Sequence, residues 1–240
     1  FTLSSTFVNL LKGENDVLNA KTNPFQGLLD PRLEIWADPR DGKTYQGMPY
    51  GIPSSQASTA LRGSAINLRN GNSVVLSADL PQVFMDYAEV CFILSEVNGF
   101  SQDWYEKGVE ASLEYWNGLS VGFNKEDFSA QIEDYLAKLP PANAETVYTQ
   151  KYIAYFLQGY QAWSLIRRTG YPRTVVRPGE FNYLGADGTK YTFEPLAGDD
   201  IPSRLTYPVS EQTLNPNNYG AARATIGNDA LDTRVWWDVP

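Results

Sequence analysis

Apolar residues recur at helical spacing through the middle third of the chain. Between residues 81 and 97 they fall three or four positions apart, the period of one face of a helix. Asp79 is suited to cap this helix, with Pro81 in its first turn, and Gly99 is suited to end it. The pattern therefore predicts a first helix from Pro81 to Val97. Its apolar positions are Phe84, Tyr87, Ala88, Cys91, Leu94 and Val97.

Three further helices follow from the same signals. A second helix carries the residues from Trp104 to Trp116, and a third covers about residues 125–138 and begins after Asn124. A fourth covers about residues 145–168, with Gly170 beyond its last turn. The first two helices resemble a tetratricopeptide hairpin, a unit that needs neighbours to bury its apolar face. The sequence therefore predicts a mainly α fold built from tetratricopeptide-like helical hairpins.

Turn residues dominate the first third of the chain, residues 1–80, where Pro and Gly recur at short intervals. Only short elements fit between these turns. We expect a short helix from Thr6 to Lys12 and brief strands at Leu33 to Trp36 and Val74 to Leu76. The fold should therefore contain extensive irregular loops and a few short β-strands.

The last third returns to turn residues and favours one hairpin. Its strands are Phe181 to Leu184 and Lys190 to Phe193, and Asp187-Gly188 supplies the positive φ that such a turn needs. The segment from Pro202 to Pro216 is predicted to form an irregular but ordered surface wrap. We interpret the chain as part of one domain with three portions: a loop-rich portion (1–80), a helical core (81–170) and a C-terminal wrap (171–240).

The charge balance narrows the choice of partners. The net charge is −9 and the sequence pI is about 4.6. Nucleic acids and anionic membranes bind clustered cations, and the local basic cluster of Arg167-Arg168 and Arg173 is too short, and lies among aromatic residues, so neither partner is expected. Aromatic residues make up 13% of the chain, which suits either core packing or a surface on which sugars stack. Composition alone does not separate these two uses.

The residue types present exclude several classes of chemistry. The chain has no His and a single Cys, Cys91, within an apolar run. Conventional zinc sites, Ser-His-Asp catalysis and Cys-His catalysis all require residues that are missing. No glycine-rich phosphate loop of the Walker or Rossmann spacing occurs. We therefore expect no cofactor and no enzyme activity. A structural Ca²⁺ stays open, since Asp30 to Asp41 and Gly198-Asp199-Asp200 offer carboxylates without the spacing of an EF-hand.

Two acidic residues on the first predicted helix admit two interpretations. Glu89 and Glu96 lie two turns apart, about 10.5 Å along a helix, which is compatible with the carboxylate pair of a glycosidase. Acidic residues on a mostly apolar helix more often form ion pairs. Arg167 and Arg168 are the expected partners, because the arginine fork matches a carboxylate.

A candidate ligand site lies among the loops of the first third. Sugar-binding sites combine aromatic faces with planar polar side chains, and functional loops are commonly held by a rigid scaffold. The alternative is that these aromatic residues anchor the loops to the helices. The candidate ligand-binding residues are Trp36, Tyr45, Tyr50, Asp38, Arg40, Gln46 and Asn67.

Several short motifs, taken in order, resemble the SusD/RagB family of Bacteroidetes outer-membrane nutrient-binding lipoproteins. They extend from about Asp30 to the end and correspond to the C-terminal half of the family. The stretch Trp163 to Ile166 departs from the pattern, because the Glu that often precedes the two arginines is absent. The motifs are Asp30-Pro31-Arg32-Leu33, Tyr45-Gln46-Gly47, Tyr87-Ala88-Glu89-Val90 with Leu94, Ser95 and Glu96, Gly108-Val109-Glu110-Ala111-Ser112, Arg167-Arg168-Thr169-Gly170-Tyr171-Pro172, and Ile201-Pro202-Ser203-Arg204-Leu205-Thr206-Tyr207-Pro208 with Glu211 and Asn215 to Tyr219.

The resemblance implies a role in nutrient capture. Members of the family sit on the cell surface, held in the outer membrane by a lipid on their N-terminal half. They cap a TonB-dependent (SusC-like) transporter and bind glycans, or in some cases peptides, for import. The N-terminal half, missing here, also contributes to the ligand site, and no fixed motif marks the sugar contacts. Two other hypotheses remain: a helical-repeat module that binds proteins, and a glycosidase using Glu89 and Glu96.

Overall fold

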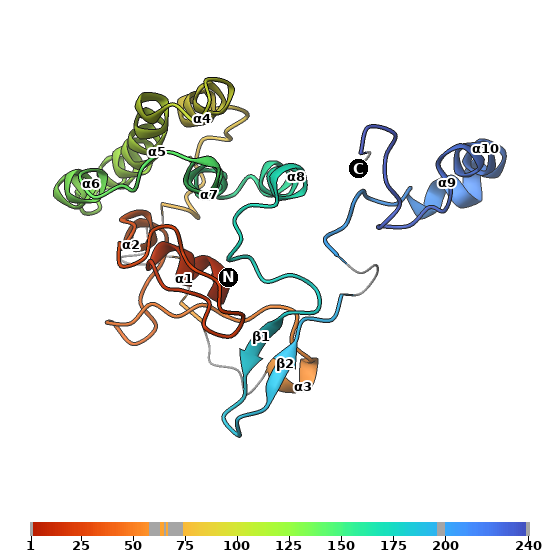
Figure 1. Ribbon diagram of the computed structural model, residues 1–240, viewed down its shortest axis with the longest axis horizontal. Coiled ribbons are helices and arrows are strands. Elements are labelled where there is room, and N and C mark those ends of the chain that lie inside the picture. The colour runs from red at the N-terminus through yellow and green to blue at the C-terminus, as the bar shows by residue number, and fades with distance from the viewer. Residues whose placement is uncertain (1, 58–62, 65, 67–73, 196–199, 239–240) are drawn as a thin grey trace.

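The computed structural model describes residues 2–57, 63–64, 66, 74–195 and 200–238. Within these residues the fold is mainly helical, with a single two-stranded sheet (Figure 1). This confirms the predicted fold class.

The centre of the fold is a helical hairpin. Helices α4 (Tyr87–Val97) and α5 (Gln102–Gly122) pack side by side, and α7 (Ala144–Ala154) packs against both (Figure 1). Gly108 allows the close approach of α5 to α4, since a Cβ at this position would lie 2.8 Å from the ring of Phe92. The helix predicted for residues 104–116 is therefore present and extends further at both ends.

The first predicted helix begins six residues later than expected. Asp86, not Asp79, caps α4, because its carboxylate accepts a hydrogen bond of 2.7 Å from the backbone N–H of Glu89. The preceding segment is not helical. Its apolar residues Phe84 and Met85 are 86% and 61% exposed, so coiling this segment into a helix would bury little apolar surface.

The third and fourth predicted helices are also revised. Helix α6 covers only Ser129–Leu136, and Asn124, with φ of +55°, belongs to the turn after α5. The predicted helix 145–168 is two helices, α7 and α8 (Gly159–Thr169). They are separated where Leu157 takes φ of +68°, a conformation that no helix tolerates. Gly170, with φ of +77°, ends α8 as predicted.

The first third contains short helices among loops. Helix α1 (Ser5–Leu11) confirms the predicted helix, and α3 (Ser54–Ala57) is a single turn. The strand predicted at Leu33 to Trp36 is wrong, since these residues belong to α2 (Arg32–Trp36). Four of its five residues are buried, and so short a segment carries too little periodicity to distinguish strand from helix. Residues 74–76, also predicted as a strand, form a bend and a turn.

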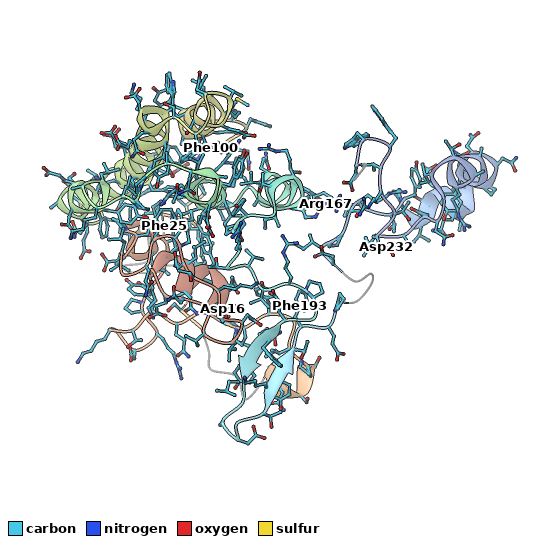
Figure 2. The ribbon with its side chains drawn as sticks, in the orientation of Figure 1. Asp16, Phe25, Phe100, Arg167, Phe193 and Asp232 are labelled. Carbon is cyan, nitrogen blue, oxygen red and sulfur yellow. The ribbon has the colours of Figure 1, made fainter. Side chains whose placement is uncertain are left out.

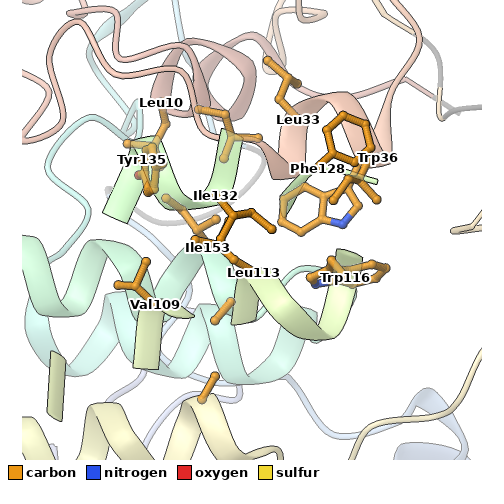
Figure 3. Close-up of a cluster of buried hydrophobic side chains, with 14 of the residues drawn as sticks. Leu10, Leu33, Trp36, Val109, Leu113, Trp116, Phe128, Ile132, Tyr135 and Ile153 are labelled. Carbon is orange, nitrogen blue, oxygen red and sulfur yellow. The ribbon is translucent and has the colours of Figure 1, made fainter. Parts of the chain in front are cut away.

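A continuous hydrophobic core joins the first third to the helices (Figure 3). Trp36 of α2 is fully buried at its centre. Its ring stacks on Phe156, with centroids 4.1 Å apart, and meets Trp116 of α5 edge-on at 5.2 Å. Phe7 of α1 extends the stack through both Trp36 and Phe156. The loops of the first third are therefore anchored on the helical scaffold by aromatic side chains.

The C-terminal part contains the predicted hairpin and two unexpected helices. Strands β1 (Phe181–Leu184) and β2 (Lys190–Thr192) pair antiparallel, and Gly188 in their turn has φ of +83°. The prediction of an irregular wrap over residues 202–216 is partly wrong, because α9 (Val209–Leu214) is helical and α10 (Pro216–Ile226) follows it. Neither helix has a buried residue, and Figure 1 shows both set apart from α4 to α8.

Candidate functional site

A polar pocket of about 240 Å³ lies where α1, the loop after it and the hairpin meet. We call it the α1 pocket. Three stretches far apart in the sequence, residues 5–18, 46–49 and 174–184, form its walls, so it exists only in the folded chain. Its lining residues are Ser5, Thr6, Asn9, Leu10, Glu14, Asn15, Asp16, Val17, Leu18, Gln46, Gly47, Pro49, Thr174, Val176, Phe181, Asn182, Tyr183 and Leu184.

Asp16 shapes the loop that follows α1 (Figure 2). Its carboxylate accepts hydrogen bonds from the backbone N–H of Leu18 at 3.1 Å and of Asn19 at 3.3 Å. The Asn19 side-chain amide donates a further bond of 2.7 Å to the same carboxylate. Two backbone bonds of 3.0 Å between Asp16 and Lys21 close the turn. Asx turns of this kind fix a loop without help from regular secondary structure.

The hairpin is held against this loop by polar contacts. The Asn19 side chain donates to the carbonyl of Phe181 at 2.7 Å and accepts from its N–H at 2.9 Å, which imitates one step of a β-ladder. Lys21 donates to the carbonyl of Val175 at 3.0 Å and pairs with Glu180. Segments about 160 residues apart in the chain are thus locked together as two walls of the pocket.

Tyr50 does not line the pocket but supports two residues that do, Asn182 and Val176. The Asn182 amide donates to the carbonyl of Tyr50 at 2.5 Å, and the Tyr50 hydroxyl donates to the carbonyl of Val176 at 2.8 Å. The Tyr50 ring also meets Phe193 edge-on at 5.6 Å. Burial raises the pKa of Tyr50, so this phenol stays protonated as a donor. The other atom of the Asn182 amide, Oδ1, is buried without a hydrogen-bond partner among the described residues.

Three side-chain amides offer hydrogen bonds within the pocket. Asn15 accepts from the N–H of Asn23 at 2.8 Å, and Gln46 accepts from Arg40 at 2.7 Å; within the described residues neither NH₂ group has a hydrogen-bond partner. The side chain of Asn9 makes no hydrogen bond within the described part of the chain and is only partly buried. Such planar donors match hydroxyl and carbonyl oxygens of a polar ligand.

Aromatic and acidic side chains complete the lining. Phe181 is 38% exposed, and Tyr183 stacks on its cross-strand partner Tyr191 with ring centroids 5.8 Å apart. Glu14 and Asp16 contribute carboxylates, and no Lys or Arg lines the pocket. The amine of Lys190 lies over the Phe181 ring at 5.0 Å from its centroid. The combination of one exposed aromatic ring, side-chain amides and carboxylates is suited to an uncharged polar ligand.

Of the predicted aromatic candidates, one is fully buried and two are partly buried. Trp36 is fully buried and packed among other aromatic rings, so it has no face left for a ligand. This candidate is wrong, because α2 turns it into the core. Tyr45 is partly buried and packs against the same core, and partly buried Tyr50 donates to the carbonyl of Val176 without lining the α1 pocket.

The predicted polar candidates do not lie together in one site. Gln46 lines the α1 pocket, and exposed Arg40 donates to it from outside the pocket lining. Asp38 is partly buried and does not line the pocket. Asn67 lies outside the described residues. The structure therefore brings one predicted candidate, Gln46, into the pocket, with Arg40 and Tyr50 supporting it.

The predicted ion pairs exist only in part. Arg168 binds Glu96 through two hydrogen bonds of 2.5 and 2.9 Å, which lower the pKa of Glu96. Glu89 instead accepts from the Tyr155 hydroxyl at 2.8 Å. Arg167 turns to the other side of α8 and pairs with Asp238 near the C-terminus. Adjacent residues on a helix point about 100° apart, so the two arginines could not both face α4.

The acidic stretches proposed for Ca²⁺ do not form a metal site in the described residues. Within the described residues, no group of three or more His, Cys, Asp or Glu side chains is arranged to hold a metal ion. The carboxylate of Asp30 is engaged by Arg32, and that of Asp41 accepts from the N–H groups of Lys43 and Thr44. Gly198 and Asp199 lie outside the described residues.

The family is decided by comparison with known proteins. A family model described as SusD-like, starch-binding and associating with the outer membrane matches residues 4–208. The chain belongs to the SusD-like family. Among curated proteins no match was found. In the described residues of this SusD-like chain, no helix is long and apolar enough to span a bilayer.

Three solved structures share the fold. One is named a chitin-binding protein, with 25% identity and a TM-score of 0.68 over all of this chain and 50% of its own. A chitin-binding SusD homolog from Flavobacterium johnsoniae has 22% identity and a TM-score of 0.63, covering 99% of this chain and 49% of its own. A Bacteroidetes AC2a SusD-like protein has 26% identity and a TM-score of 0.54, covering 74% and 33%. The SusD-like chain thus spans half or less of the length of each.

Most residues of the α1 pocket escape prediction from the sequence. The run Glu14-Asn15-Asp16 carries a turn signal that points to a structured loop in this SusD-like chain. Nothing local to Asn182 or Asn9 indicates that the two residues line one cavity, because they meet through contacts between distant segments.

Proposed function

We propose that this SusD-like protein captures an oligosaccharide at the cell surface and binds it through the α1 pocket. The match to a family described as starch-binding carries the proposal, and two structural relatives are named as chitin-binding. The pocket supports it with free amides from Asn9, Asn15 and Gln46 beside the aromatic rings of Phe181 and Tyr183. Polar groups of this kind fix a ligand's orientation, while aromatic faces supply contact area.

Binding without hydrolysis fits the surroundings of the two helix acids. Glycosidases need two carboxyl groups facing one sugar. Here Glu96 is bound by Arg168, and Glu89 is covered by the hydroxyl of Tyr155. Neither residue lines the α1 pocket. We therefore propose a binding protein, not a glycosidase.

The proposal includes the partners of a nutrient-uptake system. We infer that the bound glycan passes to a TonB-dependent outer-membrane transporter, and that a further part of the protein carries the lipid anchor. The relatives are about twice as long as this chain, which supports the existence of that further part. Exposed apolar side chains such as Phe84 and Trp236, 86% and 85% exposed, are suited to be covered by additional protein surface.

Calorimetric titration tests the proposal. The protein is titrated with chitin and starch oligosaccharides and with a wider panel of plant and fungal glycans, and each mixture is then examined for released sugar. We expect saturable binding of at least one glycan and no hydrolysis. Binding of peptides alone, or no binding across the panel by the protein at its natural length, would contradict glycan capture.

A second candidate function is a helical-repeat module that binds another protein. The burial of Trp36 and the partial burial of Tyr45 and Tyr50 favour it, since these aromatics anchor loops. The exposed apolar side chains around the start of α4 would then form the contact surface. Glycan titration separates the two, because a protein-binding module has no affinity for sugars.

A further inference from the structure

We propose that the α1 pocket selects one terminal, uncharged sugar unit and disfavours acidic sugars. This inference rests on the proposed glycan-binding function and specifies its ligand. Three observations support it. The pocket is small, its side-chain amides have NH₂ groups without a partner among the described residues, and its two carboxylates have no cation beside them in the lining.

The size of the pocket suits one sugar unit. Its volume of about 240 Å³ falls below the range of roughly 300–1,000 Å³ typical of sites that enclose drug-sized ligands. It equals the liquid volume of about eight water molecules at ~30 Å³ each. A single sugar ring with its hydroxyl groups has comparable bulk, so the rest of an oligosaccharide would extend into solvent.

The hydrogen-bonding groups suit neutral hydroxyls. The side-chain oxygens of Asn15 and Gln46 accept hydrogen bonds from the protein, and in the part of the chain that the structure describes their NH₂ groups have no partner and can donate to a ligand. Asn9 offers both an acceptor and a donor. Sugar hydroxyls donate and accept, so they satisfy all three amides without introducing charge.

The charges of the pocket act against an anionic ligand. Glu14 and Asp16 line it, whereas the nearby amine of Lys21 is engaged by Glu180 and a carbonyl. Lys12 pairs with Glu14 at 2.7 Å but does not line the pocket. A uronic or sialic acid would bring a carboxylate next to two others, with no cation among the lining residues. The amine of Lys190 lies outside that lining, over the Phe181 ring at 5.0 Å from the ring centroid. Discrimination through such repulsion is a recognised source of specificity.

The walls are held in place before a ligand arrives. Hydrogen bonds fix the loop and the hairpin. They are those of the Asp16 turn, the pair between Asn19 and Phe181, and the one between Asn182 and Tyr50. A rigid site spends little binding free energy on ordering its own side chains. Differences in shape and charge between sugars should therefore appear as differences in their dissociation constants.

The test compares neutral and acidic probes on matched variants. Chitotetraose and maltotetraose serve as neutral probes, and tetragalacturonate serves as the acidic probe. Asn9→Ala removes a side chain with no described hydrogen bond, and Gln46→Glu removes a donor while keeping the acceptor for Arg40. Gln131→Ala, on the exposed surface of α6, is the control. We expect both pocket variants to weaken binding of the neutral probe about tenfold or more, and the control to leave it unchanged.

A gain of function tests the charge argument. Glu14→Gln keeps the size of the side chain and removes one carboxylate from the pocket. We expect it to strengthen binding of tetragalacturonate about threefold or more, with little change for the neutral probe.

Two results would overturn the inference while leaving glycan capture standing. One is that Asn9→Ala and Gln46→Glu, both folded by their thermal melting curves, bind the neutral probe as the parent does. The other is that tetragalacturonate binds the parent protein as tightly as the neutral tetramers. A failure of every glycan in the wider panel would instead overturn the proposed function itself.

Discussion

The guanidinium of Arg32 is fully buried and binds the carboxylate of Asp30 through two parallel hydrogen bonds of 2.9 and 2.6 Å. It also donates to Ser112 of α5 at 2.8 Å and to Gln150 of α7 at 2.6 Å. Gln150 in turn donates to the hydroxyl of Tyr135 in α6 at 2.8 Å. One arginine at the start of α2 thus links the loop-rich third to three helices of the core.

Replacing Arg32 by Met is expected to lower the free energy of unfolding by about 3–5 kcal/mol, because the charge of Asp30 would stay buried without its partner. Urea denaturation followed by circular dichroism measures the change. The exposed pair Lys107–Asp103 on α5 supplies the control, and Lys107→Met should cost at most about 0.5 kcal/mol. Equal midpoints for Arg32→Met and the parent would refute the role of this network.

Two glycines of α5 should respond in opposite directions to the same change. Gly108→Ala would place a Cβ 2.8 Å from the ring of Phe92, and the resulting crowding is expected to cost about 1–3 kcal/mol. Gly118 has open space around its Cβ position, so Gly118→Ala should stabilise the helix by about 0.5–1 kcal/mol. Thermal melting of both variants tests the contact between α4 and α5. A stabilised Gly108→Ala protein would show that the two helices do not approach so closely.

Local signals in the sequence predict the helical scaffold well. The apolar period gives α4 and α5, Gly170 marks the end of α8, and Asp187-Gly188 gives the hairpin turn. Each of these features depends on residues within one or two turns of chain. The break between α7 and α8 is not local in this sense, because Leu157 there has no intrinsic preference for its positive φ.

The candidate site depends on distant contacts and is predicted poorly. Trp36 sits in a turn-rich segment next to polar residues, a setting equally typical of exposed and anchoring aromatics. Its burial follows from the positions of Trp116 and Phe156, which lie far along the chain. The α1 pocket likewise requires Asn19 to meet Phe181, 162 residues away. Only Gln46 was suggested by the mixture of residues around it.

The pair Glu96–Arg168 should make stability depend on pH. The hydrogen bonds from Arg168 lower the pKa of Glu96 below its ordinary value of 4.5. A carboxyl whose pKa is lower in the folded state contributes stability above its unfolded pKa and loses that contribution as the pH falls through the folded pKa. Because Arg168 is 53% exposed, solvent screening limits the contribution to about 1 kcal/mol.

Comparison of Glu96→Gln with the parent measures this contribution. Urea midpoints are determined at pH 7 and at several values below 4.5, with exposed Glu110→Gln as the control. We expect the parent to be more stable than Glu96→Gln at pH 7, and the difference to shrink as the pH falls below 4.5. A difference that is constant with pH would show that the charge of Glu96 is not the source.

The C-terminal segment should behave differently from the helical core. Trp236 and Trp237 are 85% and 64% exposed and pack mainly on each other, edge to face at 5.1 Å. The helices before them, α9 and α10, have no buried residue. Segments that bury little apolar surface open at low free-energy cost. We therefore expect amide hydrogens of residues 209–226 to exchange much faster than those of α5, as measured by mass spectrometry.

Fluorescence quenching gives an independent check on the same segment. Acrylamide should quench Trp236 and Trp237 efficiently, whereas Trp36 and Trp116 lie in the core and should be protected. Replacing both exposed tryptophans by Phe is expected to remove most of the accessible fraction, while a Trp104→Phe control should remove much less. If further protein surface covers these tryptophans, its presence should protect them from quenching and slow the amide exchange of this segment. Slow exchange of residues 209–226 in this chain alone would show that the segment is stable without such a cover.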